Sequence, residues 1–256
     1  MTAAATPSLS TRDLTIRFGG HVAVNGVTAD FFPGQLTVIV GPNGAGKTTC
    51  FNLMSGQLPA TSGQVLLRGR DITKLGPARR TRLGIGRAFQ LTNLFPHLTV
   101  MENVRLAVQS RAHAGLDMFS LWFGHRELIE RAEHFLQRVN LHDRRDALAA
   151  SLPHGDKRKL EVALLLALEP DILMFDEPTA GMSVDEVPVV LDLIRQVKED
   201  RSKTVLLVEH KMDVVRSLAD RIIVLHNGTL VADGDPAEVM ASDIVQEAYL
   251  GTATHD

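Results

Sequence analysis

The chain has 256 residues, 45% hydrophobic and 22% charged, which is typical of a globular protein with a sizeable core. Its formal net charge of −3 argues against general nucleic-acid binding and against a polybasic membrane anchor. A single cysteine, Cys50, excludes a disulfide framework. The absence of a secretory signal, together with a longest apolar run of only Val162–Leu168, leads us to expect an intracellular chain without a membrane span.

The first ninety residues predict mostly strands and turns. Leu14–Phe18 alternates between apolar and polar side chains, and a second strand is expected at Val27–Phe32. The compact run Leu36–Val40 is of the kind that is buried on both faces of a parallel sheet. A short helix is expected after this run, ending near Gly56.

From about residue 91 to residue 150 the pattern becomes helical. Arg126–Asn140 places its apolar residues on one stripe with charges opposite, as in an ordinary amphipathic core helix, and we assign it no chemistry. Asn227-Gly228 is a strong hairpin signal. The other predicted elements are helices at Lys157–Ala167 and Val189–Lys198, and strands at Val65–Leu67, Ile172–Phe175, Val205–Val208, Ile222–Leu225 and Thr229–Ala232. The sequence therefore predicts an α/β core interrupted by a helical lobe.

The segment GPNGAGKT matches the phosphate-loop pattern G-x-x-x-x-G-K-[ST] in full. Its glycines let backbone N–H groups surround phosphates at the N-terminus of a helix. Lys47 supplies a positive charge to the β- and γ-phosphates, and the Thr48 hydroxyl is the natural Mg²⁺ ligand. A purely structural glycine turn is disfavoured, because the motif follows a buried-type strand and opens a helix. The predicted nucleotide-binding residues here are Gly41, Pro42, Asn43, Gly44, Ala45, Gly46, Lys47, Thr48 and Thr49.

Two acids end the apolar strand Asp171–Glu177. Asp176 stands where a carboxylate can hold Mg²⁺ through water, and Glu177 could polarise a water molecule for attack. Adjacent acids at a strand end are by themselves more often a solvated turn. The phosphate loop upstream favours the catalytic interpretation.

With these motifs in place, the chain resembles the ATP-binding cassette family, the motor subunits of ABC transporters, from about Leu14 to Gly251. Gln90 stands at the family's Q-loop, His210 at its switch histidine, and Phe18 where the family stacks an aromatic ring on adenine. The resemblance implies a P-loop NTPase (RecA-like) core with an antiparallel β subdomain and an inserted α-helical lobe. We expect one ATP-binding domain over residues 8–251, with the core at 8–90 and 151–251 and the lobe at 91–150.

The resemblance also implies a mechanism and partners. Two cassettes would close head to tail around two ATP molecules, as a homodimer or a heterodimer, on the cytoplasmic face of the membrane. Glu177 would be the general base, His210 would hold the γ-phosphate and the attacking water, and Gln90 would contact Mg²⁺. Two integral membrane permease subunits and, indirectly, a solute-binding protein would complete the assembly. Nucleic acid is not expected among the partners.

The signature motif departs from the family pattern, because LSGGQ is replaced by LPHGD at residues 152–156. Pro153 lacks the hydroxyl and N–H of a serine, although proline suits the first turn of a helix. His154, Gly155 and Asp156 are expected to contact the partner's nucleotide, Asp156 through a ribose hydroxyl. The basic run at residues 157–159 is expected to be a solvated face rather than a partner for Asp156. If the second cassette carries a full signature, one ATP site would be standard and the other slow.

A finer resemblance is to cassettes of branched-chain amino-acid and amide importers. It is carried by FGGHVAVNGV, NLFPHLTVMENV, VEHKMDVV and EAYLG. The implied function is ATP hydrolysis coupled to import of branched-chain amino acids or related amides and organic acids. The alternatives are a cassette for lipid or lipopolysaccharide export, and a non-transport cassette in DNA repair or on the ribosome. A protein that binds ATP without hydrolysing it is disfavoured, because Glu177 and His210 are both present. The arginine cluster is interpreted as a solvated face or a subunit contact; it comprises Arg79, Arg80, Arg82 and Arg87.

Overall fold

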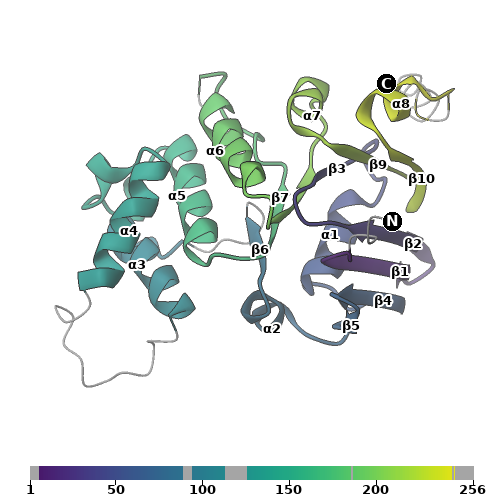
Figure 1. The fold of residues 1–256 in the computed structure, drawn as a ribbon, viewed down its shortest axis with the longest axis horizontal. Helices are drawn as coiled ribbons and strands as arrows, with labels where there is room; N and C mark the ends of the chain where they lie inside the picture. The colour runs from purple at the N-terminus through teal and green to yellow at the C-terminus, as the bar shows by residue number, and fades with distance from the viewer. Residues whose placement is uncertain (1–5, 89–93, 113–125, 186, 244, 246–256) are drawn as a thin grey trace, which may run out of the picture. The chain divides into compact units, whose positions relative to one another are not determined.

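The computed structural model describes residues 6–88, 94–112, 126–185, 187–243 and 245 (Figure 1). The chain divides into two compact units. The first comprises residues 1–85, 171–177 and 197–256, and the second comprises residues 86–170 and 178–196. Gln90 and the C-terminal EAYLG segment lie outside the described residues.

An antiparallel sheet of the first unit has the strand order β2-β1-β4-β5. Its strands are β1 (Leu9–Phe18), β2 (His21–Phe31), β4 (Ser62–Leu67) and β5 (Arg70–Asp71). The strand predicted at Leu14–Phe18 begins five residues earlier, at Leu9. Leu9 pairs with Phe31 of β2 on one side and with Leu67 of β4 on the other. This sheet carries Phe18 and His21 at the tip of the β1–β2 hairpin.

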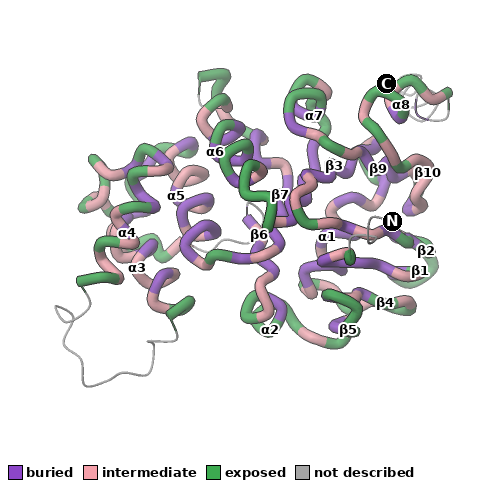
Figure 2. The backbone as a smooth tube through the Cα atoms, viewed as in Figure 1, coloured by how far each residue is buried: buried purple, intermediate pink, exposed green. Residues whose placement is uncertain are grey.

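The second sheet is largely parallel, with the strand order β10-β9-β3-β8-β7-β6. Its strands are β3 (Leu36–Val40), β6 (Ile85–Ala88), β7 (Ile172–Asp176), β8 (Thr204–Val208), β9 (Arg221–His226) and β10 (Thr229–Gly234). Every residue of β3, β7 and β8 is buried, as their apolar runs predicted (Figure 2). Because these three strands are parallel, their carboxyl ends lie at one edge of the sheet, where ligands of such sheets bind.

In the described part of the first unit, four helices lie wholly within it: α1 (Lys47–Ser55), α2 (Pro77–Arg82), α7 (Met212–Leu218) and α8 (Pro236–Ala241). The helix predicted to end near Gly56 is α1, and Gly56 caps it in a left-handed conformation. The buried residues of α1 belong to one hydrophobic cluster that also contains residues of both sheets. The interpretation of the arginine cluster as a solvated face is wrong for Arg80, which is 1% exposed.

The second unit is helical. It contains α3 (Val100–Arg111), α4 (Arg126–Arg138), the short turns η3 (His142–Arg144) and η4 (Ala149–Ser151), α5 (His154–Ala167) and most of α6 (Val187–Glu199). The first three of these α-helices pack against one another. The stripe predicted for α4 is confirmed at its centre and end, where Ala132, Leu136 and Val139 are fully buried.

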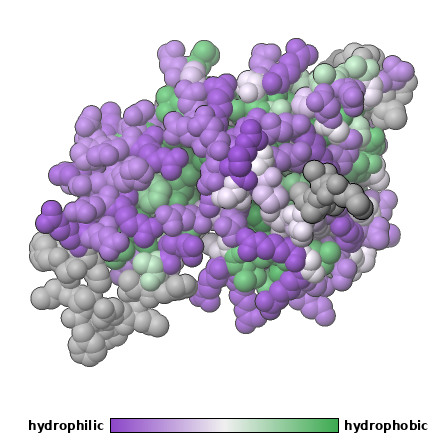
Figure 3. All heavy atoms as spheres, viewed as in Figure 1, coloured by the Kyte–Doolittle hydropathy of each residue, from purple (hydrophilic) through white to green (hydrophobic). Residues whose placement is uncertain are grey.

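Hydrophilic side chains dominate the face of the molecule shown in Figure 3. Within the described ranges, none of the helices combines the length and the hydropathy that crossing a bilayer requires.

Candidate functional site

The phosphate loop runs from the end of β3 into α1, and its shape depends on glycine. Gly41 has φ +149°, and a β-carbon there would lie 2.1 Å from the carbonyl oxygen of Leu225. Gly46, the residue that caps α1, has φ +95°, and its β-carbon would lie 2.4 Å from the carbonyl oxygen of Ala23. No side chain fits at either position. The first turn of α1 therefore opens directly from the loop, and its unpaired N–H groups suit an anion.

The β9–β10 hairpin supports this loop from the side. Its Asn227-Gly228 turn has positive φ at both residues, as the Asn-Gly signal predicted. The amide of Gly228 donates to the carbonyl of Ala45 at 3.1 Å, and the amide of Asn25 donates to the carbonyl of Gly228 at 2.8 Å. The hairpin was predictable from sequence, but its contact with the phosphate loop was not.

Lys47 is the cation of the loop and is 7% exposed. Its Nζ donates to the carbonyl of Gly41 at 2.7 Å and to the carbonyl of Pro42 at 2.9 Å. Burial lowers the pKa of Lys47, and the negative charges of Glu177 and Asp176 oppose that shift. The ammonium group is thus held beside the loop and near two carboxylates, where it can bind phosphate oxygens.

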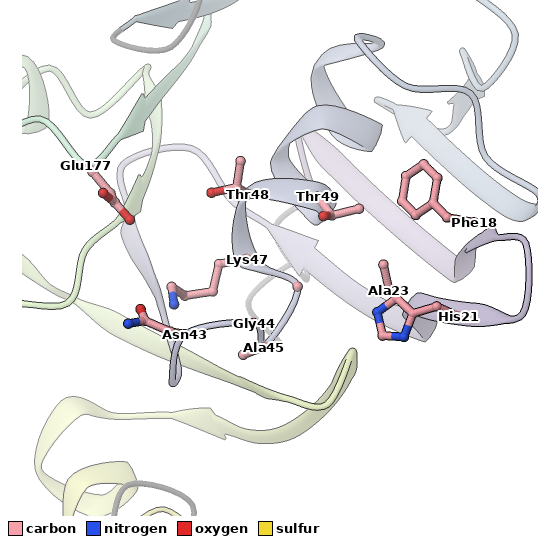
Figure 4. A pocket seen from close by; sticks show the side chains of 11 residues that line it. Phe18, His21, Ala23, Asn43, Gly44, Ala45, Lys47, Thr48, Thr49 and Glu177 are labelled. Carbon is pink, nitrogen blue, oxygen red and sulfur yellow. The ribbon is translucent and has the colours of Figure 1, made fainter. Parts of the chain in front are cut away.

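A cavity of about 420 Å³ adjoins the loop, within the size range of small-molecule sites (Figure 4). Phe18 and His21 lie toward one end of it, and Lys47 and Glu177 toward the other. The structure brings together nine of the residues singled out from sequence: Phe18, Asn43, Gly44, Ala45, Gly46, Lys47, Thr48, Thr49 and Glu177.

His21 and Ala23 also line this cavity, and the sequence analysis missed both. They follow Phe18 closely in the chain, on the other side of the hairpin turn. The Gly19-Gly20 turn was therefore the signal that could have identified them.

The two acids at the end of β7 lie in different environments. Asp176 is 2% exposed, whereas the side chain of Glu177 is 40% exposed and lines the cavity. Glu177 has φ +49°, a left-handed conformation that costs a non-glycine residue about 1–3 kcal/mol. Its amide donates to the carbonyl of Val208 at 3.0 Å, which holds this backbone in place. The Nδ1 atom of His210 lies 4.0 Å from the Glu177 Oε1 atom, so the structure brings two of the three predicted catalytic residues together; the third, Gln90, lies outside the described residues.

Mg²⁺ fits the donors present here. Among the described residues, no group of three or more His, Cys, Asp and Glu side chains forms a cage for a metal. Mg²⁺ usually takes one or two protein oxygens and completes its shell with phosphates and water. Thr48 on the cavity wall and Asp176 at the end of β7 meet that requirement.

The signature residues lie in the second unit, at the start of α5. Pro153 is the N-cap, and His154, Gly155 and Asp156 form the first turn. The Asp156 carboxylate pairs with Arg144 at 3.2 Å and with Lys159 at 2.8 Å.

The prediction of a solvated basic run is wrong for two of its members. Lys159 pairs with Asp156, and Arg158 pairs with Glu161 at 3.0 Å; both basic side chains are less than one-fifth exposed. Burial raises the pKa of Glu161, and its hydrogen bond and ion pair with Arg158 oppose that shift. These two side chains lie along the surface of α5, beside their acidic partners, instead of projecting into solvent.

The sequence model of the ABC transporter family matches residues 24–180, more than half of the chain. A second model, described as branched-chain amino acid ATP-binding cassette transporter, matches residues 229–255. The chain is 37% identical over 252 residues to the high-affinity branched-chain amino acid transport ATP-binding protein LivG of Escherichia coli K12, covering 96% of this chain and 99% of LivG. It is 38% identical over 254 residues to BraF of Pseudomonas aeruginosa, a protein of the same description, with the same coverage.

Solved structures agree with this relationship. The ADP conformation of an ATP-binding cassette of an ABC transporter superposes with a TM-score of 0.80 at 29% identity, covering 96% of this chain and 99% of that one. A dimeric post-hydrolysis cassette bound to ADP and phosphate superposes with a TM-score of 0.75 at 26% identity, covering 89% and 98%. The predicted P-loop NTPase fold is confirmed. The chain belongs to the ABC transporter family and is one of its ATP-hydrolysing proteins.

Proposed function

We propose that this chain is the ATPase subunit of an importer for branched-chain amino acids or closely related amides and organic acids. The observation that carries the proposal is the match of residues 229–255 to the branched-chain amino acid cassette model. The similarity to LivG and BraF over almost the whole length of each chain supports it further.

In the proposed mechanism, the phosphate loop and the start of α1 hold the ATP phosphates, with Lys47 at the β- and γ-phosphates. Phe18 stacks on the adenine ring at the far end of the cavity. Glu177 accepts the proton of the attacking water, and His210, 4.0 Å away, holds that water and the γ-phosphate. The left-handed backbone of Glu177 keeps its carboxylate directed at the cavity.

Mg²⁺ would be held by the hydroxyl of Thr48 and the carboxylate of Asp176, together with phosphate oxygens and water. Gln90, which the family resemblance adds to these ligands, lies outside the described residues. When bound there, the ion neutralises charge that develops on the phosphates during transfer.

Two cassettes are proposed to act together, with the α5 start of each facing the nucleotide of the other. His154, Gly155 and Asp156 would then complete the partner's site. Because Asp156 is already paired with Arg144 and Lys159, it is a weaker acceptor for a ribose hydroxyl than an unpaired carboxylate. This favours a heterodimer in which the nucleotide bound by this chain meets a full signature from a different cassette.

The membrane partners are proposed to be two permease subunits, which dock from the cytoplasmic side on the helical unit. Phe95 and Leu148 are large apolar side chains of this unit that are about half exposed. Their segments lie side by side, since Thr99 bridges to Leu148 and the amide of Ala149 donates to the carbonyl of Leu98. A short apolar permease helix would cover them.

The test starts with affinity purification of the tagged chain from detergent-solubilised membranes of its source cell, followed by mass spectrometry. We expect two multi-span proteins and a second cassette. The purified complex is then placed in liposomes with the co-encoded solute-binding protein, and uptake of radiolabelled leucine is measured with ATP inside. A complex containing Glu177→Gln is the control.

Uptake that requires ATP and disappears in the control would support the importer. Recovery of an export-type membrane pair, or ATP-dependent movement of lipid without uptake of leucine, amides or organic acids, would contradict it. Recovery of soluble partners alone would remove the transport function altogether.

A further inference from the structure

A buried carboxylate lies next to His210 in the chain and has no role in the mechanism so far. Glu209 follows the end of β8 and is 0% exposed, whereas the side chain of His210 is about half exposed. Taking an ionised carboxylate out of water is costly unless hydrogen bonds replace its hydration. An apolar residue would fill this volume without that cost, so the carboxylate itself needs an explanation.

Two hydrogen bonds of the Glu209 carboxylate are directed at the backbone that carries the histidine. Its Oε2 atom accepts from the amide of His210 at 2.9 Å and from the amide of Lys211 at 3.2 Å. These two amides lie between the end of β8 and the start of α7. A single buried oxygen therefore fixes the path of the chain at His210.

The same carboxylate lies close to the imidazole ring. Nδ1 of His210 is 3.9 Å from the Glu209 Oε2 atom and 4.0 Å from the Glu177 Oε1 atom. The backbone connects these groups as well, because the amide of Glu177 donates to the carbonyl of Val208, directly before Glu209. His210 thus lies between the proposed general base and a buried carboxylate at the ends of adjacent parallel strands.

We propose that Glu209 is a positioning residue for ATP hydrolysis, which acts through His210 by holding its backbone and its imidazole ring against Glu177. This inference rests on the proposed role of His210 at the γ-phosphate. Glu209 does not contact the nucleotide in this arrangement. Its loss should therefore lower the rate of the chemical step and leave nucleotide affinity, which depends on the phosphate loop, unchanged.

The experiment is a double-mutant cycle on the full-length chain, with single-turnover hydrolysis of radiolabelled ATP and binding of a fluorescent ATP analogue as readouts. Glu209→Ala is made with His210 intact and with His210→Ala. With His210 intact, we expect Glu209→Ala to lower the hydrolysis rate about tenfold or more and to keep the nucleotide Kd within about twofold of the unsubstituted chain. In the His210→Ala background, we expect Glu209→Ala to cause no further loss of rate. Glu209→Gln keeps an acceptor oxygen for both amides and should restore most of the rate.

Asp220→Ala is the matched control. The Asp220 carboxylate also accepts a hydrogen bond from a backbone amide, that of Leu36 at 2.9 Å. Leu36 is the first residue of β3, whereas Glu209 follows the carboxyl end of β8. Any effect of Asp220→Ala on rate should be the same with and without His210. If Glu209→Ala does not fold, Glu209→Asp, which withdraws the carboxylate by one methylene, takes its place in the cycle.

Two results would overturn the inference: an unchanged rate of hydrolysis, whether or not the nucleotide Kd weakens, or an equal loss of rate in the His210→Ala background. Failure of the proposed mechanism itself would give a different result, in the His210→Ala single variant. If His210→Ala alone leaves hydrolysis unchanged, the role proposed for His210 fails, and the positioning role of Glu209 fails with it.

Discussion

The phosphate loop and the start of α5 are both helix N-termini for which the sequence predicts contact with nucleotide, and they are built differently. The loop is fixed by its backbone, because Gly41 and Gly46 lie against carbonyl oxygens and exclude any side chain. The start of α5 is held by side chains, with Pro153 as its cap and Asp156 paired to Arg144 and Lys159. A loop fixed by its backbone tolerates few substitutions. A helix start held by ion pairs can accept other residues at its first positions and still form the helix. The altered signature motif lies at the second.

The largest expected effect concerns chemistry at the loop. Glu177→Gln keeps the size of the side chain and removes the base, so we expect the rate of hydrolysis to fall by roughly 100-fold to 10,000-fold. Nucleotide affinity should change little, because Lys47 and the loop are untouched. Single-turnover hydrolysis and equilibrium binding of ATP measure the two quantities separately. A fall of less than about tenfold would show that another group accepts the proton.

A smaller effect is expected from Gly46→Ala, which tests whether the backbone fixes the loop. Its β-carbon would lie 2.4 Å from the carbonyl of Ala23, so the loop must shift, and we expect ATP affinity to fall by about 100-fold. Gly44→Ala is the matched control in the same loop. Gly44 has φ +79° with no protein atom within 4 Å of its β-carbon, so the substitution brings left-handed strain of about 1–2 kcal/mol but no clash within the loop. Equal losses in the two variants would contradict the steric argument. Isothermal titration with ATP measures both.

The third prediction concerns the far end of the same helix. The Arg80 guanidinium donates to four backbone carbonyls, two of which are at the C-terminal end of α1: Leu53, Met54, Thr73 and Leu75. Burial lowers the pKa of Arg80 to about 10, which still leaves it charged at neutral pH. Arg80→Met leaves these carbonyls without their donor and should lower the free energy of unfolding by about 3 kcal/mol.

Labelling of the only thiol measures this loss, because Cys50 is buried in α1 and reacts when the helix opens. The protein is incubated in increasing urea and pulsed with a thiol reagent. Arg79→Met is the control, since Arg79 is exposed on α2 beside Arg80, and it should change the free energy of unfolding by less than about 0.5 kcal/mol. A midpoint for Arg80→Met equal to that of the control would contradict the capping role.

Much of the first site could be predicted from sequence, because its chemistry and its local geometry reside in the same residues. A strand of buried residues, a glycine loop and a helix cap occur consecutively from Leu36 to Gly56, and Asn227-Gly228 specifies its own turn. The carboxyl ends of parallel strands then bring Glu177 and His210 together, as the motif order implied.

What could not be predicted depends on partners that are distant in the chain. Arg80 resembles its exposed neighbours in sequence, and only the fold brings the carbonyls of Leu53 and Met54 to it. Asp156 likewise finds Arg144 through the packing of the helical unit. Arg80 was therefore assigned to solvent because its partners lie outside the local pattern. Arg158 and Lys159 differ, because their acidic partners are three residues away on α5, and that spacing was present in the sequence.

The smallest expected effect tests the start of α5 itself. In a complex whose only active site uses the partner's phosphate loop and this chain's α5, Pro153→Ser would add a hydroxyl and an N–H donor for the γ-phosphate. Glu177→Gln in this chain creates that complex, because hydrolysis must then come from the partner's nucleotide. We expect Pro153→Ser to raise this residual rate by about tenfold, since one hydrogen bond to a charged group contributes about 1.5–3 kcal/mol at most. The same substitution with Glu177 intact should change total turnover far less. An unchanged residual rate would mean that the helix dipole of α5 already supplies what the serine would add, and that the two helix N-termini differ in construction but not in their effect on ATP.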